Sequence, residues 1–154
     1  MARQFRIEAK DEVAMSAFGE SLAVLLRDGD CLLLEGDLGA GKTTLARAIV
    51  EAMTGETEVP SPTYTLVQTY SCPDVEVWHA DLYRLEAPHD VHPLGLLDVM
   101  DEVVSLIEWP DRLGELRPLD ALTVRIGFDG QGRSVVLEAP DHSDWGERLE
   151  RADF

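Results

Sequence analysis

A glycine-rich stretch at residues 36–43, with the sequence GDLGAGKT, constrains the fold of this chain more than any other feature. It fits the pattern G-x-x-x-x-G-K-[ST], in which the glycines let backbone amides come close to phosphate oxygens. In such a loop Lys42 reaches the terminal phosphates, and the hydroxyl of Thr43 can bind Mg²⁺. The pattern therefore predicts that a di- or triphosphate is bound by one continuous segment: Asp37, Leu38, Gly39, Ala40, Gly41, Lys42, Thr43 and Thr44.

The segments on both sides of this loop indicate a strand–loop–helix unit. The apolar run Cys31–Leu34 before the loop is typical of a short buried strand. After the loop, apolar residues recur at helical spacing from Leu45 to Met53, and Gly55 follows as the expected end of the helix. A chain of 154 residues is long enough for a substantial core. We therefore expect an α/β fold, a single phosphate-loop NTPase-like domain over residues 1–154 with a mixed central β-sheet flanked by helices.

The remaining elements follow from the spacing of apolar, β-branched and turn residues. A helix is expected from its N-cap, Asp11, to about Gly29. A broken helical segment is expected at Asp90–Val99, and a short helix after Ser143. Strands are expected at the following positions: Phe5–Ile7, Thr63–Tyr70, Val75–Asp81, Val103–Ile107, Leu122–Ile126 and Val135–Leu137.

The charge of the chain bears on the partners that it can have. Against 30 acidic residues the sequence has only 13 Lys and Arg, so its formal net charge is −17. A surface this acidic repels the phosphate backbone of nucleic acids. The composition therefore argues against strong direct binding of RNA or DNA.

The sequence also indicates a compartment. Cys31 and Cys72 are 41 positions apart and have no C-x-x-C spacing, which is typical of reduced thiols that serve as packing residues. Residues 1–6 lack the apolar core of a signal peptide, and no apolar run approaches the length of a membrane-spanning helix. We expect a cytoplasmic protein without a membrane segment.

A phosphate loop needs a further carboxylate, which completes the Mg²⁺ ligands and places the attacking water. Glu108 is the better candidate, because it directly follows the compact apolar run Val103–Ile107. Asp81 is the second candidate, at the end of the run Val75–Ala80, with His79 two residues earlier on the same strand face. For each of these carboxylates the alternative is an ordinary solvated residue at a strand end.

Four other residues allow more than one interpretation. Trp109, beside the first candidate carboxylate, could stack on a purine or belong to the core. Arg84 could contact a phosphate or pair with a nearby acid. His89 and His92 have no third soft ligand near them in the sequence, so they are interpreted as exposed loop residues and not as metal ligands.

Four motifs in this order resemble those of the TsaE family: GDLGAGKTT at 36–44, SPTYTLV at 61–67, HADLYR at 79–84 and IEWP at 107–110. The resemblance extends from the first expected helix to the last expected hairpin. It implies a mixed sheet between helices and an ATPase subunit that uses Mg²⁺ and serves threonylcarbamoyladenosine synthesis on tRNA. The partners that it implies are the protein pair that transfers the threonylcarbamoyl group to tRNA, which the ATPase would reset between turnovers.

The resemblance also implies roles for individual residues. Lys42, Asp81 and Glu108 are expected to be catalytic. Lys42 would hold phosphates, Thr43 and Glu108 would bind Mg²⁺, and Asp81 would support catalysis. These roles agree with those that the phosphate-loop pattern itself gives to Lys42 and Thr43.

Further residues are implied to lie near the nucleotide. Thr63 is in a segment that resembles a switch loop beside the γ-phosphate, and Trp109 would lie close to the nucleotide. Arg133, in the sequence GQGR, would touch a phosphate or the base. The chain departs from the family at Met15, where a threonine is common, so a polar contact with the base from that side is not expected.

Three other functions fit the sequence less well. A GTP-binding switch of this class reads guanine with an N-K-x-D element, and the chain contains no asparagine. A small-molecule kinase is the alternative, although 154 residues leave little room for an acceptor pocket and a mobile lid. Direct tRNA binding conflicts with the charge of −17.

Hydrolysis by the protein alone is expected to be slow and to be stimulated by partner proteins. Fast phosphoryl transfer needs neutralisation of the charge that develops, often by an arginine supplied in cis or by a partner. Arg84 is the strongest local candidate for this role and Arg133 a weaker one. The strongly negative net charge makes the general field unfavourable for further negative charge.

Overall fold

A computed structural model describes residues 2–58, 66–152 and 154. The strands form one seven-stranded mixed sheet in the order β1-β7-β6-β2-β5-β4-β3. They are β1 (Arg3–Ala9), β2 (Cys31–Glu35), β3 (Val67–Ser71), β4 (Glu76–Asp81), β5 (Val104–Glu108), β6 (Leu122–Asp129) and β7 (Gly132–Ala139). The α-helices are α1 (Glu12–Ala23), α2 (Lys42–Thr54), α3 (Leu96–Val99) and α4 (Trp145–Arg151), and the 3₁₀ helices are η1 (Pro88–Leu94) and η2 (Pro110–Leu116).

The central strand β2 is buried on both of its faces. Leu32 and Leu34 pack into the core that β2 shares with α1, α2 and α4. Cys31 and Leu33 point to the other face, into a second core closed by η1, α3 and η2. A strand that is covered on both faces has a continuous apolar sequence instead of an alternating one. This explains the unbroken apolar run that precedes the phosphate loop.

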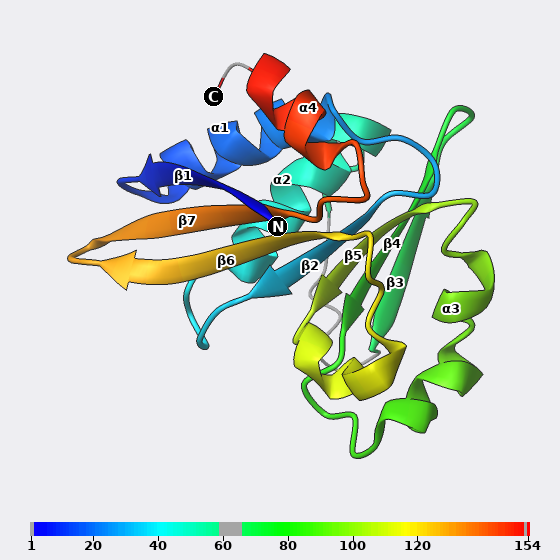
Figure 1. The fold of residues 1–154 in the computed structure, drawn as a ribbon. Helices are drawn as coiled ribbons and strands as arrows, with labels where there is room; N and C mark the ends of the chain where they lie inside the picture. The colour runs from blue at the N-terminus through cyan, green and yellow to red at the C-terminus, as the bar shows by residue number, and fades with distance from the viewer. Residues whose placement is uncertain (1, 59–65, 153) are drawn as a thin grey trace.

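Helices cover both faces of the sheet, and the two layers differ. Figure 1 shows α1, α2 and α4 gathered on one side, with α3 and the neighbouring short helices at the opposite side. The longest described helix is α2, with 13 residues. Within the described ranges, no helix has both the length and the apolar character needed to cross a bilayer.

The mixed α/β architecture confirms the expected fold class, and the two hairpins form as the sequence predicts. The first helix was expected to reach about Gly29, and this was wrong, because α1 ends at Ala23. The amides of Leu25 and Leu26 bond to carbonyls only three residues back, so the chain leaves the helix in a turn. Leu26 still packs into the core, which is why the apolar spacing continues beyond the helix.

The strand expected at Thr63–Tyr70 is described only in part. β3 begins at Val67, because Leu66, which was expected to belong to the strand, has a left-handed φ of 66°. Residues 59–65 lie outside the described part of the chain. Thr63, which the family resemblance places near the γ-phosphate, is among them. The described part of the strand pairs with β4 in antiparallel register, with Val67 opposite Ala80.

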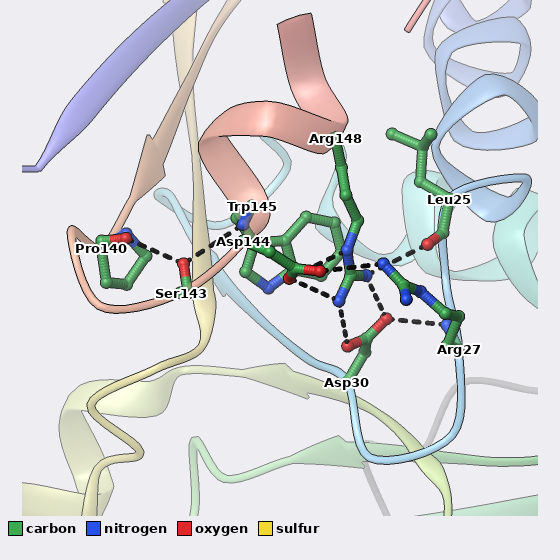
Figure 2. A network of polar contacts seen from close by, with 8 residues as sticks. All are labelled: Leu25, Arg27, Asp30, Pro140, Ser143, Asp144, Trp145 and Arg148. Carbon is green, nitrogen blue, oxygen red and sulfur yellow. Dashed lines mark hydrogen bonds and ion pairs between the residues drawn. The ribbon is translucent and has the colours of Figure 1, made fainter. Parts of the chain in front are cut away.

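The C-terminal helix is attached to the turn before β2 by a network of polar contacts around Arg148 (Figure 2). Its guanidinium donates two hydrogen bonds to Asp30, of 2.6 and 3.0 Å, and one of 3.1 Å to the carbonyl of Leu25. It also pairs with Asp144 and lies 4.2 Å from the ring centroid of Trp145. The Arg148 and Asp30 side chains are only 14% and 11% exposed. This pair is therefore shielded from solvent and fixes α4 to the central strand.

We expect Arg148→Ala to lower the free energy of unfolding by about 2–3 kcal/mol, because it leaves the Asp30 carboxylate largely buried without its bidentate partner. Urea unfolding followed by circular dichroism measures the change. Arg27→Ala is the matched control, since Arg27 pairs with Asp144 through a side chain that is 62% exposed. It should cost less than about 1 kcal/mol, as exposed pairs do. Equal losses in the two variants would contradict the assignment of the main anchor to Arg148.

Candidate functional site

The candidate site lies where three neighbouring parallel strands end. β2, β5 and β4 are adjacent and run in the same direction, so their carboxyl ends meet at one edge of the sheet. β2 leads into the phosphate loop, β5 ends at Glu108 and β4 ends at Asp81. In the sheet register, Glu108 is opposite Leu34 on one side and Asp81 on the other. The topology thus collects three segments that are far apart in the sequence.

The phosphate loop connects β2 to α2, which begins at Lys42. All three of its glycines have positive φ angles: 151° at Gly36, 81° at Gly39 and 112° at Gly41. At Gly36 a Cβ would come within 2.6 Å of the carbonyl oxygen of Ile126 on β6, so the loop passes too close to that strand for any side chain. The first amides of α2 have no acceptors within the helix, and the helix dipole is positive at this end. The loop therefore leads to a helix terminus suited to an anion.

Lys42 turns back over the loop from the start of α2. Its Nζ donates to the carbonyl oxygens of Gly36 and Asp37, the second at 3.4 Å. The same atom lies 3.7 Å from the ring centroid of Trp109, which is a cation–π contact. Only 5% of Lys42 is exposed. The Lys42 ammonium is therefore bound inside the loop by weak, neutral partners, namely two backbone carbonyls and an aromatic ring.

Thr43 and Glu108 meet beside the lysine. The Thr43 hydroxyl donates to the Glu108 carboxylate, with Oγ1 at 3.1 Å from Oε1 and 3.3 Å from Oε2. His79 approaches the same carboxylate from β4, with Nε2 at 2.7 Å from Oε2. Glu108 is 2% exposed and His79 is completely buried. The carboxylate is thus fixed between a helix N-terminus and a neighbouring strand.

The ionisable side chains of the site are largely buried, so water screens the interactions between their charges only weakly. Burial lowers the pKa of Lys42, because desolvation disfavours the ammonium form. The carboxylates of Glu108 and Asp81 act in the opposite direction on the same pKa. Asp81 is 7% exposed, so it too is largely removed from water. Neither carboxylate is a solvated strand-end residue.

Aromatic rings extend the site beyond β4 and β5. The Asp81 carboxylate accepts a hydrogen bond of 3.0 Å from the amide of Tyr83, and this contact shapes the turn after the strand. The Tyr83 ring lies 4.9 Å from the ring of Trp109, centroid to centroid. Trp109 has φ 58° and ψ 52°, a left-handed conformation that is uncommon for a bulky residue. In this conformation the Trp109 ring packs against both Tyr83 and Lys42.

Arg133 supports the phosphate loop from β7. Its guanidinium donates to the carbonyl oxygens of Ala40 and Gly39, at 2.9 and 3.2 Å. It also stacks over Phe128, with 4.5 Å between the guanidinium carbon and the ring centroid. Arg133 therefore contacts the outer part of the loop, whereas Lys42 contacts its first residues.

Two cavities of about 340 Å³ each adjoin the loop. One contains the two carboxylates, Lys42, Thr43 and Trp109 among its lining residues. The other is lined by the start of α1, including the buried Met15, and by Arg133. The first has the polar groups of a phosphate and metal site, and the second is an adjacent space with a partly apolar wall.

The oxygen donors present suit Mg²⁺, which prefers hydroxyl, carboxylate and phosphate oxygens. Thr43 and Glu108 offer such atoms side by side. Across the part of the chain that the structure describes, no three His, Cys, Asp or Glu side chains form a preassembled metal site. Mg²⁺ is commonly held by one or two protein oxygens together with waters and substrate phosphates, so this donor set fits it.

The structure brings together most of the residues predicted from the sequence, namely Lys42, Thr43, Asp81, Glu108 and Trp109. Their roles stay predictions. All five line one cavity at the carboxyl edge of the sheet.

Other candidates are placed elsewhere. Arg84 is exposed after β4 and does not line either cavity. His89 and His92 are exposed, as expected, although they lie on the 3₁₀ helix η1 and not in a loop. Arg133 reaches the loop but not the cavity of the carboxylates.

Sequence reasoning missed two contacts at the site. The sequence predicts only that His79 shares a strand face with Asp81, and it does not predict the bond to Glu108. Tyr83 is not among the predicted site residues, although it packs on Trp109. The two-residue spacing of His79 and Asp81 was a usable signal, since alternate residues of a strand face the same side.

Comparisons with known proteins agree with the motifs. A family model described as "Threonylcarbamoyl adenosine biosynthesis protein TsaE" matches residues 9–135. A tRNA threonylcarbamoyladenosine biosynthesis protein TsaE from Rickettsia conorii is 42% identical over 134 residues, covering 86% of this chain and 77% of that protein. The protein of the same name from Haemophilus influenzae is 35% identical over 135 residues, covering 84% and 85%.

A solved structure is similar as well. The crystal structure of YdiB from Bacillus subtilis superposes with a TM-score of 0.82 at 27% identity, covering 97% of this chain and 94% of that one. The family match spans the phosphate loop, both candidate carboxylates and Arg133. The chain therefore belongs to the TsaE family of threonylcarbamoyladenosine biosynthesis proteins.

Proposed function

We propose that this protein binds ATP with Mg²⁺ at the phosphate loop and hydrolyses it as an accessory subunit in threonylcarbamoyladenosine synthesis on tRNA. The observation that carries the proposal is the Glu108 carboxylate within hydrogen-bonding distance of Thr43, beside Lys42. A phosphate-loop ATPase needs these three groups together. Membership of the TsaE family supports the pathway.

The phosphates of the nucleotide would enter the cavity of the carboxylates. Lys42 would exchange the carbonyls of Gly36 and Asp37 for phosphate oxygens, which are stronger partners because the bond is charge-assisted. Thr43 and Glu108 would hold Mg²⁺, which when bound neutralises charge on the phosphates. The α2 N-terminus would add its dipole.

Asp81 is the group best placed to orient the attacking water. It is opposite Glu108 in the register of β4 and β5, and both line the same cavity. Its carboxylate is largely buried and is positioned by the Tyr83 amide. We assign the water to Asp81 because Thr43 already bonds to Glu108.

The nucleoside would extend toward the second cavity. Met15 lines its wall, so this side offers an apolar surface and not a hydroxyl for the base. Arg133 would act there by holding the outer loop through Gly39 and Ala40. Trp109, over Lys42, would contact the phosphate end of the nucleotide.

An accessory role explains why the site has so few basic side chains. Among the described residues that line the carboxylate cavity, Lys42 is the one basic side chain. Arg133 is engaged by loop carbonyls on the other side. We propose that the threonylcarbamoyl-transferring protein pair docks near this cavity and supplies the missing positive charge. Hydrolysis would then be coupled to docking.

The purified protein should release phosphate from ATP at less than about 1 s⁻¹, the lower range of kinases, and at least about tenfold faster with the transferring pair. An arginine supplied by a partner can contribute about 10³–10⁵ in rate. Steady-state phosphate release with and without the pair measures this. Faster turnover by the protein alone, unchanged by the pair, would reject the accessory role and favour a small-molecule kinase.

Glu108→Gln should raise the Mg²⁺ concentration needed for nucleotide binding by at least about tenfold, as disturbed metal ligation typically does. Asp81→Asn should change it by less than about threefold, while slowing hydrolysis, because Asp81 is assigned to the water and not to the metal. Calorimetric titrations of ADP at several Mg²⁺ concentrations separate the two. If Asp81→Asn alone removed the Mg²⁺ dependence, the metal ligand would belong to β4.

ADP should change the tryptophan fluorescence, because phosphate draws the Lys42 ammonium away from the Trp109 ring. Trp109→Phe should remove most of this change. Trp78 and Trp145 stay in that variant as internal references. A response that persists in Trp109→Phe would place the nucleotide away from this ring.

A further inference from the structure

His79 is a buried polar residue that the roles above do not use. It lies on β4, two residues before Asp81, and none of its surface is exposed. Its Nε2 atom is 2.7 Å from Oε2 of Glu108 on the neighbouring strand. The contact is diagonal across the sheet, because His79 is opposite Leu106 in the register.

The direction of this hydrogen bond follows from the chemistry of the two groups. A carboxylate can only accept, so beside a carboxylate at Glu108 the hydrogen bond requires the N–H to be on Nε2 as the donor. The other ring nitrogen, Nδ1, is buried without a partner among the described residues. Within the described part of the chain, the hydrogen bond to Glu108 is therefore the one directed contact of the imidazole.

Stability alone is a weak reason for such an arrangement. Burying a polar ring and a carboxylate costs free energy, and a well-packed apolar pair is often as stable as a buried pair of this kind. A completely apolar ring at position 79 would suit the surrounding core, in which Leu106 and Val77 are also completely buried. The donor must therefore be explained by what it does to Glu108.

The two carboxylate oxygens of Glu108 have different surroundings. Oε2 accepts from His79 at 2.7 Å and is 3.3 Å from the Thr43 hydroxyl. Oε1 is the oxygen nearer to Thr43, at 3.1 Å. A short bond to one oxygen fixes the rotation of the whole group, and it leaves the other oxygen directed at the start of α2.

We infer that His79 is a positioning residue, which holds Oε2 of Glu108 and so presents Oε1, together with the Thr43 hydroxyl, to the Mg²⁺ of the bound nucleotide. This rests on the proposed function. Outer groups that hydrogen-bond to metal ligands orient them, and their loss typically lowers metal affinity by about 10–100-fold. His79 itself touches neither the nucleotide nor the metal.

Two substitutions at this position separate positioning from packing. The side-chain amide of glutamine reaches about as far as Nε2, whereas that of asparagine corresponds to Nδ1, which has no partner here. Both variants replace the ring by a smaller amide, so both lose packing. Only His79→Gln can still donate to Glu108.

The measurement is calorimetric titration of ADP into the full-length protein, first in EDTA and then at increasing Mg²⁺. In His79→Asn, the Mg²⁺ concentration that gives half of the maximal change in ADP affinity should be about 10–100-fold higher than in the wild type. The ADP affinity of this variant in EDTA should stay within about threefold of the wild type. His79→Gln should recover most of the Mg²⁺ response. Ser105→Ala, which alters another completely buried polar residue of the sheet, should behave like the wild type.

The outcomes are distinct. A wild-type protein whose ADP affinity ignores Mg²⁺ would overturn both the proposed metal site and the role of His79. If the wild type responds to Mg²⁺ and His79→Asn responds equally, only the positioning role would be overturned. Equal losses in His79→Asn and His79→Gln would overturn it too, because these would indicate packing alone.

A second readout needs no variant. Nitrogen NMR of protein labelled in histidine should show His79 with its proton on Nε2, and its signals should shift when Mg²⁺ is added to the ADP complex but not when ADP is added in EDTA. A proton on Nδ1, or signals that ignore Mg²⁺, would overturn the inference.

Discussion

The site depends on keeping a lysine, two carboxylates and an imidazole together where water hardly reaches. An isolated charged group in such a place would become neutral or destabilise the surrounding fold, because desolvation disfavours the charged form. Here each group lies beside one of opposite character: Lys42 near Glu108 and Asp81, and Glu108 next to His79 and Thr43. The arrangement of three adjacent parallel strands is what makes these neighbours possible, since their carboxyl ends share one edge.

The phosphate loop is held from inside and from outside by two cations with different surroundings. Lys42 bonds to the first residues of the loop and packs on Trp109, while Arg133 bonds to carbonyls farther along. On the proposed function, an incoming phosphate would replace the partners of Lys42 and leave those of Arg133 in place. The loop could then accept its ligand without losing its shape, which keeps the ordering entropy of binding small.

The parts of the fold that depend on local signals could be predicted from the sequence. The phosphate loop, the buried strand before it and the two carboxylates each follow from a short pattern of apolar, glycine or acidic residues. The bond from His79 to Glu108 and that from Arg133 to Ala40 could not be predicted in this way, because each depends on which strands are neighbours in the sheet. The end of α1 was misjudged because its apolar spacing continues into a buried turn, as Leu26 shows.

The first strand of the chain has a consequence for how the protein is made. Among the described strands, β1 pairs only with β7, with Arg3 opposite Ala139, and Arg148 later pairs with Asp30. During synthesis, β1 leaves the ribosome long before its partner exists, and pairings this distant in sequence form slowly. The sheet is completed only when almost the whole chain has emerged. Until then its apolar central strands have an open edge, to which a chaperone or another nascent chain can bind.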